Sequence, residues 1–401
     1  MIYFDNASTT PVLPDVANVV TDALHHQWGN PSSLHRLGFQ AEKAMKEARG
    51  RMAGILSAPE NSLLFTSGAT EGINTVMRSV LMQALQHKSG HVGQMESPGA
   101  DCASDETKAN IVLSAVEHAA VHETAMLFSS FGIAVREIPV DEQGQISLSD
   151  VERLVDEETL LVAVMHVNNE LGTIFPVEEV GKIVKSQSHA LYLVDGTQAL
   201  GKLPVRLSAL SCDAYVASGH KIHAPKGIGL LYVRPGTTLS PLLTGGGQEK
   251  NRRSGTENVP YILGFAEALA QMEAHREGTY DPHVVAIAKR ARERAEVLPG
   301  VHINSPENGS PYILNFALTG IKSEVLLHFM EQEEMYLSSG SACSKGKVSR
   351  ILQAIHLPEE YLDGAVRLSF GRENREEEVD PFFDRLAFSV EQIRRITGGK
   401  A

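Results

Sequence analysis

The chain has few cysteines and no surplus of basic residues. Three cysteines among 401 residues are too few for a disulfide framework, so we expect a reducing, cytoplasmic environment. The 36 lysines and arginines are outnumbered by 49 aspartates and glutamates, which gives a net charge of −13. Nucleic acids and anionic membranes bind basic surfaces, so this balance argues against either as the main partner.

Long uninterrupted apolar runs are also missing. No stretch reaches the roughly 18 residues that a membrane-spanning helix needs, and residues 1–10 lack the apolar run of a secretory signal. With 42% hydrophobic and 21% charged residues, the composition is that of a globular protein and not of a disordered or fibrous one. At about 150 residues per domain, the length predicts two or three domains.

Strand-like and helix-like segments alternate over the first two thirds of the chain. Short apolar runs predict strands, and segments with helical apolar spacing follow several of them. The predicted strands are 62–66, 111–114, 160–167, 191–195, 213–217 and 228–233, and the predicted helices are 69–86, 118–130 and 177–185. This alternation predicts an α/β fold with a mostly parallel sheet, whose functional groups gather at the carboxyl ends of the strands.

The pattern changes after about Pro260. Helical spacing and short strand-like runs follow one another there without regular alternation, which we interpret as a smaller α+β domain. The predicted helices are 261–276, 281–296, 323–331 and 376–395, and the predicted strands are 312–316 and 365–370. The polar stretch 87–110, rich in Gly, Ser and Asp, favours a surface insertion over a functional site.

One lysine has an unusual sequence context. Lys221 follows a predicted strand and lies beside His220 in the segment ASGHKIHAPKGIG, residues 217–229. The ordinary interpretation is a solvated lysine. The alternative is a lysine that forms a Schiff base, which must lose its proton and is therefore favoured by partial desolvation.

An aspartate ends another predicted strand. Asp195 is followed by Gly196, Thr197 and Gln198. It is either a helix N-cap or the partner of a protonated pyridine nitrogen, the charge state that makes pyridoxal phosphate an electron sink. In the second case, Gln198 would donate to the phenolic oxygen of the ring.

Three further segments contain candidate donors for anions. TSGATEG, residues 66–72, is either a plain strand-to-helix turn or a phosphate cradle at a helix N-terminus. The glycine-rich run 245–258 is either a flexible loop or a source of phosphate contacts from residues such as Thr256. Arg367 ends a strand-like run and is either a surface residue or a ligand for a carboxylate through its planar guanidinium.

Cys343 lies among small and cationic residues in SSGSACSKGK, residues 338–347. An accessible cysteine near positive charge is biased toward the reactive thiolate, whereas Cys212 has the surroundings of a packing residue. His118 follows a predicted strand, where it is a cap, a core residue or part of a site. Asn169 follows the most apolar predicted strand, 160–167.

Taken together, these segments resemble the cysteine desulfurases, the NifS-like branch of the class V aminotransferases. The similarity runs in order from FDNASTTP (4–11) through GNPSSLH (29–35) to RLSFGREN (367–374) and covers nearly the whole chain. It implies a fold-type-I, pyridoxal-phosphate-dependent transferase that forms a homodimer. A large cofactor-binding domain would span 15–259, and a smaller domain, 1–14 with 260–401, would contain the cysteine loop.

The resemblance also implies roles for individual residues. Lys221 would bind pyridoxal 5′-phosphate covalently, His118 would stack on its ring, and Cys343 would accept sulfur. No metal is expected. Further cofactor contacts would come from Ala69, Thr70, Asn169, Asp195, Gln198, Ser218, His220 and the partner subunit's Thr256, and substrate contacts from Arg367, Asn169 and Asn6.

The implied activity is the conversion of L-cysteine to L-alanine. Its sulfur would pass to Cys343 as a persulfide and then to an acceptor protein for iron–sulfur cluster assembly, tRNA thiolation or cofactor biosynthesis. The alternatives are a selenocysteine lyase and a non-catalytic sulfur-relay protein of the same fold. A Rossmann-type oxidoreductase is disfavoured, because the glycine fingerprint of a dinucleotide site is missing.

Overall fold

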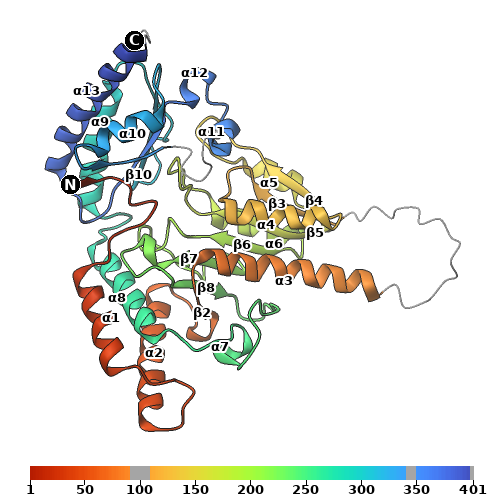
Figure 1. Ribbon diagram of the computed structural model, residues 1–401. Coiled ribbons are helices and arrows are strands. Elements are labelled where there is room, and N and C mark those ends of the chain that lie inside the picture. Colours follow the sequence, from red (N-terminus) through yellow and green to blue (C-terminus); the bar gives the residue numbers. More distant parts are fainter. Residues whose placement is uncertain (91–108, 340–348, 398–401) are drawn as a thin grey trace, which may run out of the picture.

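A seven-stranded mixed sheet forms the centre of the molecule in a computed structural model that describes residues 1–90, 109–339 and 349–397 (Figure 1). Its order is β2-β8-β7-β6-β5-β3-β4. Strand β8 runs antiparallel to β2 and β7, and the other neighbouring pairs are parallel. This confirms the predicted fold class. The strands are β2 (Leu63–Thr66), β3 (Asn110–Ser114), β4 (Ala134–Ile138), β5 (Thr159–Met165), β6 (Leu191–Asp195), β7 (Ala214–Ser218) and β8 (Gly229–Val233).

Helices cover both faces of this sheet. One face packs against α3 (Ala69–Gly90) and α4 (Ala119–Ser130), and the other against α2 (Arg36–Ile55), α6 (Val177–Gln187) and α8 (Val259–His275). Successive side chains of a strand point to opposite faces. Along β5, Leu161 and Ala163 therefore contribute to the α3–α4 side, and Val162 and Val164 to the opposite side. Burial on both faces accounts for the nearly continuous apolar run in this strand.

Shorter elements complete this part of the molecule. Helix α1 packs on α8, as α2 does. These elements are α1 (Pro14–His26), α5 (Leu148–Leu154), α7 (Gln248–Asn251), η1 (Glu60–Ser62) and η2 (Gly219–Lys221). Helix α8 begins at Val259, the last residue of the predicted large domain, and most of its buried side chains belong to the larger core. The larger core therefore extends past the predicted boundary, and the division at residue 259 stays a prediction.

A second hydrophobic core lies around an antiparallel sheet of order β12-β13-β10-β9. Aromatic rings pack together within it: the ring centroids of Phe4 and Phe382 lie 4.8 Å apart, and Phe316 stacks on Phe383. Its strands are β9 (Val301–Ile303), β10 (Ile313–Leu318), β12 (Ser338–Ser339) and β13 (Ala365–Ser369). Its helical elements are α9 (Pro282–Glu296), α10 (Ser323–Glu331), α11 (Arg350–Ala354), α12 (Glu359–Leu362), η3 (Glu376–Glu378) and α13 (Val379–Thr397).

The N-terminal segment connects the two cores. Strand β1 (Ile2–Tyr3) pairs with β11 (Met335–Tyr336) beside the smaller core. The backbone of Asp5 forms an isolated parallel β-bridge with that of Ser369. Thr10 then donates its backbone N–H to the carbonyl of His220, in the short turn Gly219–Lys221 after β7. Residues 4–13 therefore pass across the carboxyl end of the large sheet.

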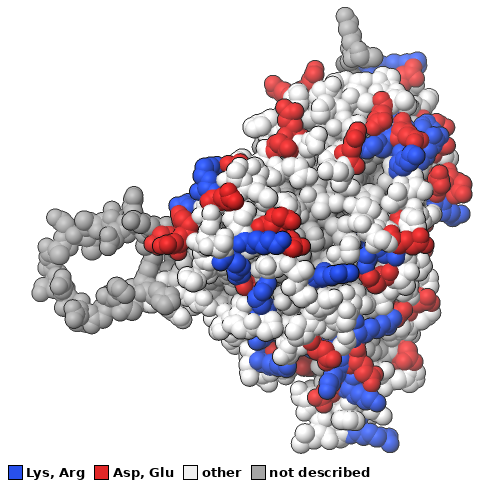
Figure 2. Space-filling model, turned by 180° about the vertical axis from the view of Figure 1, so that it is seen from behind, with Lys and Arg blue, Asp and Glu red and all other residues white. Residues whose placement is uncertain are grey.

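The charged surface is mixed. On the face that Figure 2 shows, Lys and Arg side chains alternate with Asp and Glu side chains, with uncharged areas between them. Within the described ranges, no helix is long and apolar enough to cross a membrane.

A substitution at Gly196 tests how closely the side chains are packed at the ends of the strands. A Cβ at this position would lie 1.9 Å from Cζ of Tyr215, a fully buried residue. We predict that Gly196→Ala lowers the free energy of unfolding by about 1–3 kcal/mol, measured by urea denaturation. Gly54→Ala is the control, because a Cβ there meets nothing within 4 Å and alanine favours the helix. Equal unfolding midpoints for wild type and Gly196→Ala would contradict the prediction.

Candidate active site

A cavity of about 310 Å³ lies where the strand ends meet the N-terminal segment. It collects side chains from the ends of β5, β6 and β7, from the beginnings of α3 and α4, and from β13 of the smaller core. Ten of the predicted site residues line it: Ala69, Thr70, His118, Asn169, Asp195, Gln198, Ser218, His220, Lys221 and Arg367.

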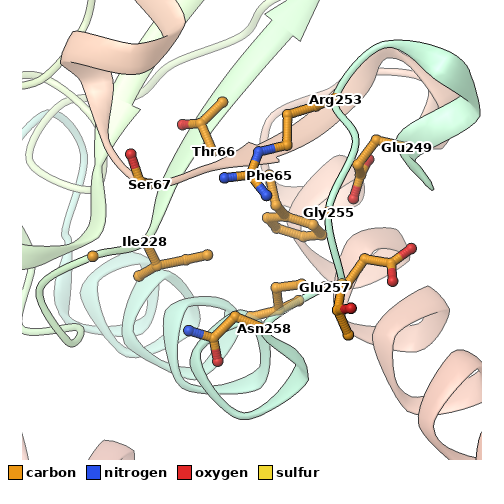
Figure 3. A pocket seen from close by; sticks show the side chains of 12 residues that line it. Phe65, Thr66, Ser67, Ile228, Glu249, Arg253, Gly255, Glu257 and Asn258 are labelled. Atoms are coloured by element: carbon orange, nitrogen blue, oxygen red, sulfur yellow. The ribbon is translucent and has the colours of Figure 1, made fainter. Parts of the chain in front are cut away.

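Three other predicted residues are not placed at this cavity. Thr256 lines a separate pocket of about 190 Å³ that also includes Arg253 and Glu249, shown in Figure 3. Asn6 is buried beside β13, where its amide donates to the carbonyl of Ser369 and to Oδ1 of Asn374. Cys343 lies outside the described residues.

Lys221 is the last residue of η2, the short turn after β7. Its Nζ donates to the carbonyls of Ala7 at 2.6 Å and Ser8 at 2.8 Å. The turn is tight, because a Cβ on Gly219 would lie 2.9 Å from a side-chain methyl of Ile228. Through these two hydrogen bonds the lysine contacts the N-terminal segment, and it also lines the cavity.

His118 both caps a helix and lines the cavity. It is the N-cap of α4, where Nδ1 accepts from the backbone N–H of Ala120 at 3.1 Å. Burial lowers the pKa of His118, the charge of Asp195 opposes this shift, and Lys221 adds to it. The imidazole is therefore neutral at pH 7, with its proton on Nε2 because Nδ1 acts as an acceptor.

Asp195 is the last residue of β6. Its position is compatible with both roles considered from the sequence, a backbone cap and a partner for a ring nitrogen. Its Oδ1 accepts the backbone N–H of Thr197 at 3.0 Å, as in a turn cap, while the residue also lines the cavity. The carboxylate is buried and contributes to the pKa shift of His118. A positively charged ring nitrogen is a suitable partner for such a carboxylate.

The beginning of α3 lies at one end of the cavity. Ala69 donates its backbone N–H to Oγ of Ser218 at 2.8 Å, which fixes the hydroxyl beside the first turn of the helix. His220 contacts Oγ1 of Thr9 at 3.1 Å. Burial and the nearby Lys221 lower the pKa of His220 to about 4, so this ring is neutral. Hydroxyl, imidazole and helix N-terminus together suit a phosphate.

Arg367 reaches the cavity from β13 and is not a surface residue, since it is only 6% exposed. Its Nη1 donates to the carbonyl of Asn169 at 2.8 Å. Its Nη2 donates to Oδ1 of Asp5 at 2.9 Å and to Oγ of Ser8 at 2.7 Å. Among the described residues, Nε has no hydrogen-bond partner. An arginine held in this way keeps N–H donors available for a carboxylate.

Several residues that organise the site were not predicted from the sequence. Asp5 and Ser8 orient Arg367 and belong to FDNASTTP, a motif from which only Asn6 was selected. Glu117, directly before His118, is fully buried, and burial raises its pKa to about 8. Glu170, directly after Asn169, accepts from Oγ of Ser349 at 2.6 Å, and burial raises its pKa to about 7.

Comparisons with known proteins agree with this architecture. A sequence model of the family described as aminotransferase class-V matches residues 2–106 and 99–382. A cysteine desulfurase of Nostoc sp. is 37% identical over 407 residues, and the match covers 99% of this chain and 94% of that protein. Among solved structures, a NifS-like protein has a TM-score of 0.86 and 34% identity, and the match covers 98% of this chain and 99% of that chain. A structure of SspA in complex with cysteine has a TM-score of 0.76 and 28% identity, with coverage of 92% and 99%.

The chain therefore belongs to the class-V aminotransferase family. Within it, the chain belongs with the NifS-like cysteine desulfurases, which are pyridoxal-phosphate-dependent enzymes, and this confirms the resemblance seen in the motifs.

The residues of the cavity fit that cofactor. An amine, a carboxylate and a helix N-terminus line its wall, and these groups match the aldehyde, the ring nitrogen and the phosphate of pyridoxal phosphate. Within the described part of the chain, two buried atoms there, Oδ1 of Asn169 and Oγ1 of Thr197, have no hydrogen-bond partner. Buried polar atoms are normally paired, so a bound polar group would complete this wall.

Glu117 makes stability depend on pH. Its folded-state pKa of about 8 lies above the ordinary value of 4.5, so its contribution to stability is complete below about pH 4.5 and is lost as the pH rises toward 8. We predict that the stability of Glu117→Gln, relative to that of wild type, increases as the pH is raised from about 5 to about 8. The increase, measured by urea denaturation at each pH, should be on the order of 1–4 kcal/mol. The exposed neighbour Glu123, changed to Gln, is the control. A stability difference that stays constant over this pH range would contradict the prediction.

Proposed function

We propose that this enzyme is a cysteine desulfurase that converts L-cysteine to L-alanine and passes the sulfur through a persulfide on Cys343 to an acceptor protein. The observation that supports it most is the meeting of Lys221 and Arg367 at one cavity, joined by Ala7 and Ser8. A reactive amine beside a carboxylate-binding arginine is the arrangement that an α-amino acid requires. The related SspA was solved in complex with cysteine.

The cofactor would be held by residues at separate places in the cavity. Lys221 would bind its aldehyde carbon, Asp195 its ring nitrogen, and Ser218 with the first turn of α3 its phosphate. When bound, pyridoxal phosphate supplies an electron sink that makes the substrate's α-hydrogen acidic. His118, neutral because of burial, would lie against the ring without adding a charge.

The protein side chains orient the substrate and move its proton. Arg367 would bind the substrate carboxylate through donors that Asp5, Ser8 and Asn169 leave available. Asp5 also restrains the rotation of the guanidinium, so the substrate does not bear the full entropic cost of ordering it. The amine of Lys221 would act as the base that takes the proton from the substrate's α-carbon.

Sulfur transfer then needs a thiolate. In the proposed step, Cys343 attacks the sulfur of the bound cysteine, so an S–S bond forms as the C–S bond breaks. The electron pair of the broken bond stays on the substrate carbon, which takes up a proton. L-Cysteine and the Cys343 thiol thus become L-alanine and a persulfide, with no external oxidant or reductant.

Cys343 is preferred over Cys212 on chemical grounds. Cys212 is fully buried, and burial raises its pKa to about 12, so it is a thiol at neutral pH. Cys343 has Lys345 and Lys347 close in sequence, and positive charge favours a thiolate.

We also propose a cytoplasmic homodimer. Thr256 lines a pocket separate from the cavity, so contact with a cofactor would have to be to that of the partner subunit. Large apolar side chains are exposed along α1, α2 and their connection: Leu24, Trp28, Leu34 and Phe39. A second copy of the chain would cover such a surface.

The test compares two cysteine variants of the purified holoenzyme. We predict that Cys343→Ser loses at least about a hundredfold in alanine formation from L-cysteine, because the sulfur acceptor is missing, and that Cys212→Ser retains wild-type activity. Mass spectrometry after one turnover should find one added sulfur on the Cys343 peptide. Wild-type activity of Cys343→Ser on L-cysteine would refute the assignment, and activity on selenocysteine alone would indicate a selenocysteine lyase.

A further inference from the structure

Lys202 is a buried lysine with no place in the chemistry described so far. It lies in the turn region after β6 and is only 3% exposed. Its Nζ donates to Oε1 of Gln198 at 2.8 Å and lies 5.6 Å from the ring centroid of Tyr312. Lysines are almost never fully buried unless they are paired. Among the described residues, the hydrogen bond to Gln198 is the polar contact that compensates for this burial.

The contact determines how the Gln198 amide is oriented. The protonated Nζ of a lysine has N–H donors and no acceptor, so it selects the oxygen end of the amide. The nitrogen end therefore points the other way, and Nε2 donates to the carbonyl of Ala7 at 2.9 Å. The same carbonyl accepts from Nζ of Lys221 at 2.6 Å. A continuous series of hydrogen bonds thus connects the two lysines through Gln198 and Ala7.

The charges around Lys202 leave this contact intact on either side of neutral pH. Burial lowers the pKa of Lys202 to about 7, and the positive charges of Lys221 and Arg367 act in the same direction. His220 and His223 also face the amine, and both have a pKa of about 4, so they are neutral. A lysine amine donates to Oε1 whether or not it holds its third proton.

We propose that Lys202 is a positioning residue, which fixes the Gln198 amide with its N–H donors toward the cavity and toward the phenolic oxygen of the bound cofactor. This inference rests on the proposed role of Gln198. An amide that lost this contact would turn its oxygen toward the phenolic oxygen part of the time, and two acceptors repel each other. The orientation of Gln198, and not a charge at the reacting atoms, is what Lys202 supplies.

The experiment is a double-mutant cycle on the holoenzyme with Lys202→Met, Gln198→Ala and the double variant. Two properties are measured: the dissociation constant of pyridoxal phosphate, and the pH midpoint of the visible absorption change of the bound cofactor. Lys202→Met should weaken cofactor binding by about threefold to tenfold, the effect of one hydrogen bond, and raise the absorption midpoint. In the Gln198→Ala background the same substitution should change neither property further.

Two controls separate positioning from general destabilisation. Lys185→Met removes a lysine that pairs with Asp213 away from the cavity and should leave both properties unchanged. Methionine has nearly the shape of the lysine stem and no charge to bury, so Lys202→Met should fold. Lys202→Leu serves the same comparison if the methionine variant does not accumulate.

Two results would overturn the inference. One is an unchanged absorption midpoint in Lys202→Met, and the other is a shift as large in the Gln198→Ala background as in wild type. If Gln198→Ala itself changes neither property, the proposed role of Gln198 fails, and the inference fails with it. Alanine formation from L-cysteine, measured on the same samples, shows separately whether the proposed activity holds.

Discussion

The two hydrogen bonds from Nζ of Lys221 to the carbonyls of Ala7 and Ser8 connect the large sheet to the N-terminal segment and, through it, to the smaller core. Lys221 lies at the end of a strand in the large sheet, whereas Ala7 packs in the smaller aromatic core. Ser8 contacts Arg367 from that same core. If the N-terminal segment were displaced, the amine and the guanidinium would no longer share a wall, and the proposed substrate-binding end of the cavity would be lost.

Burial sets the charge of each group around this contact. Desolvation keeps His118 and His220 neutral and Glu117 protonated near neutral pH. Lys221 and Arg367 place basic side chains at the cavity, and Asp195 places an acidic one there. In the proposed complex, the phosphate and the substrate carboxylate would meet cations and helix N–H groups, and the carboxylate of Asp195 would face a positive ring nitrogen. Arg367 and Asp5 are in direct contact, so the guanidinium is already paired on one side.

Much of this arrangement was predictable from local patterns, because parallel strands bring their carboxyl ends to one edge of the sheet. Lys221, Asp195 and His118 were found in this way. The support from Asp5 was not, because it contacts Arg367 across 362 positions of sequence, and no local pattern encodes such a pairing. Helices α1 and α2 were overlooked although their buried residues have helical spacing, since glycine, alanine and charged residues dilute the apolar signal in α2. Strand β4 was missed because it lies at a sheet edge, where AVREI is partly exposed and polar.

The central claim, that Lys221 is the residue joined to the cofactor, is tested most directly by covalent trapping. Borohydride reduction of the holoenzyme makes the bond between lysine and pyridoxal phosphate permanent, and peptide mass spectrometry then locates it. The account predicts a label on Lys221 and none on Lys202 or Lys226, two lysines whose charges, like that of Lys221, act on His220. A label on either of those lysines, with Lys221 unmodified, would contradict the account.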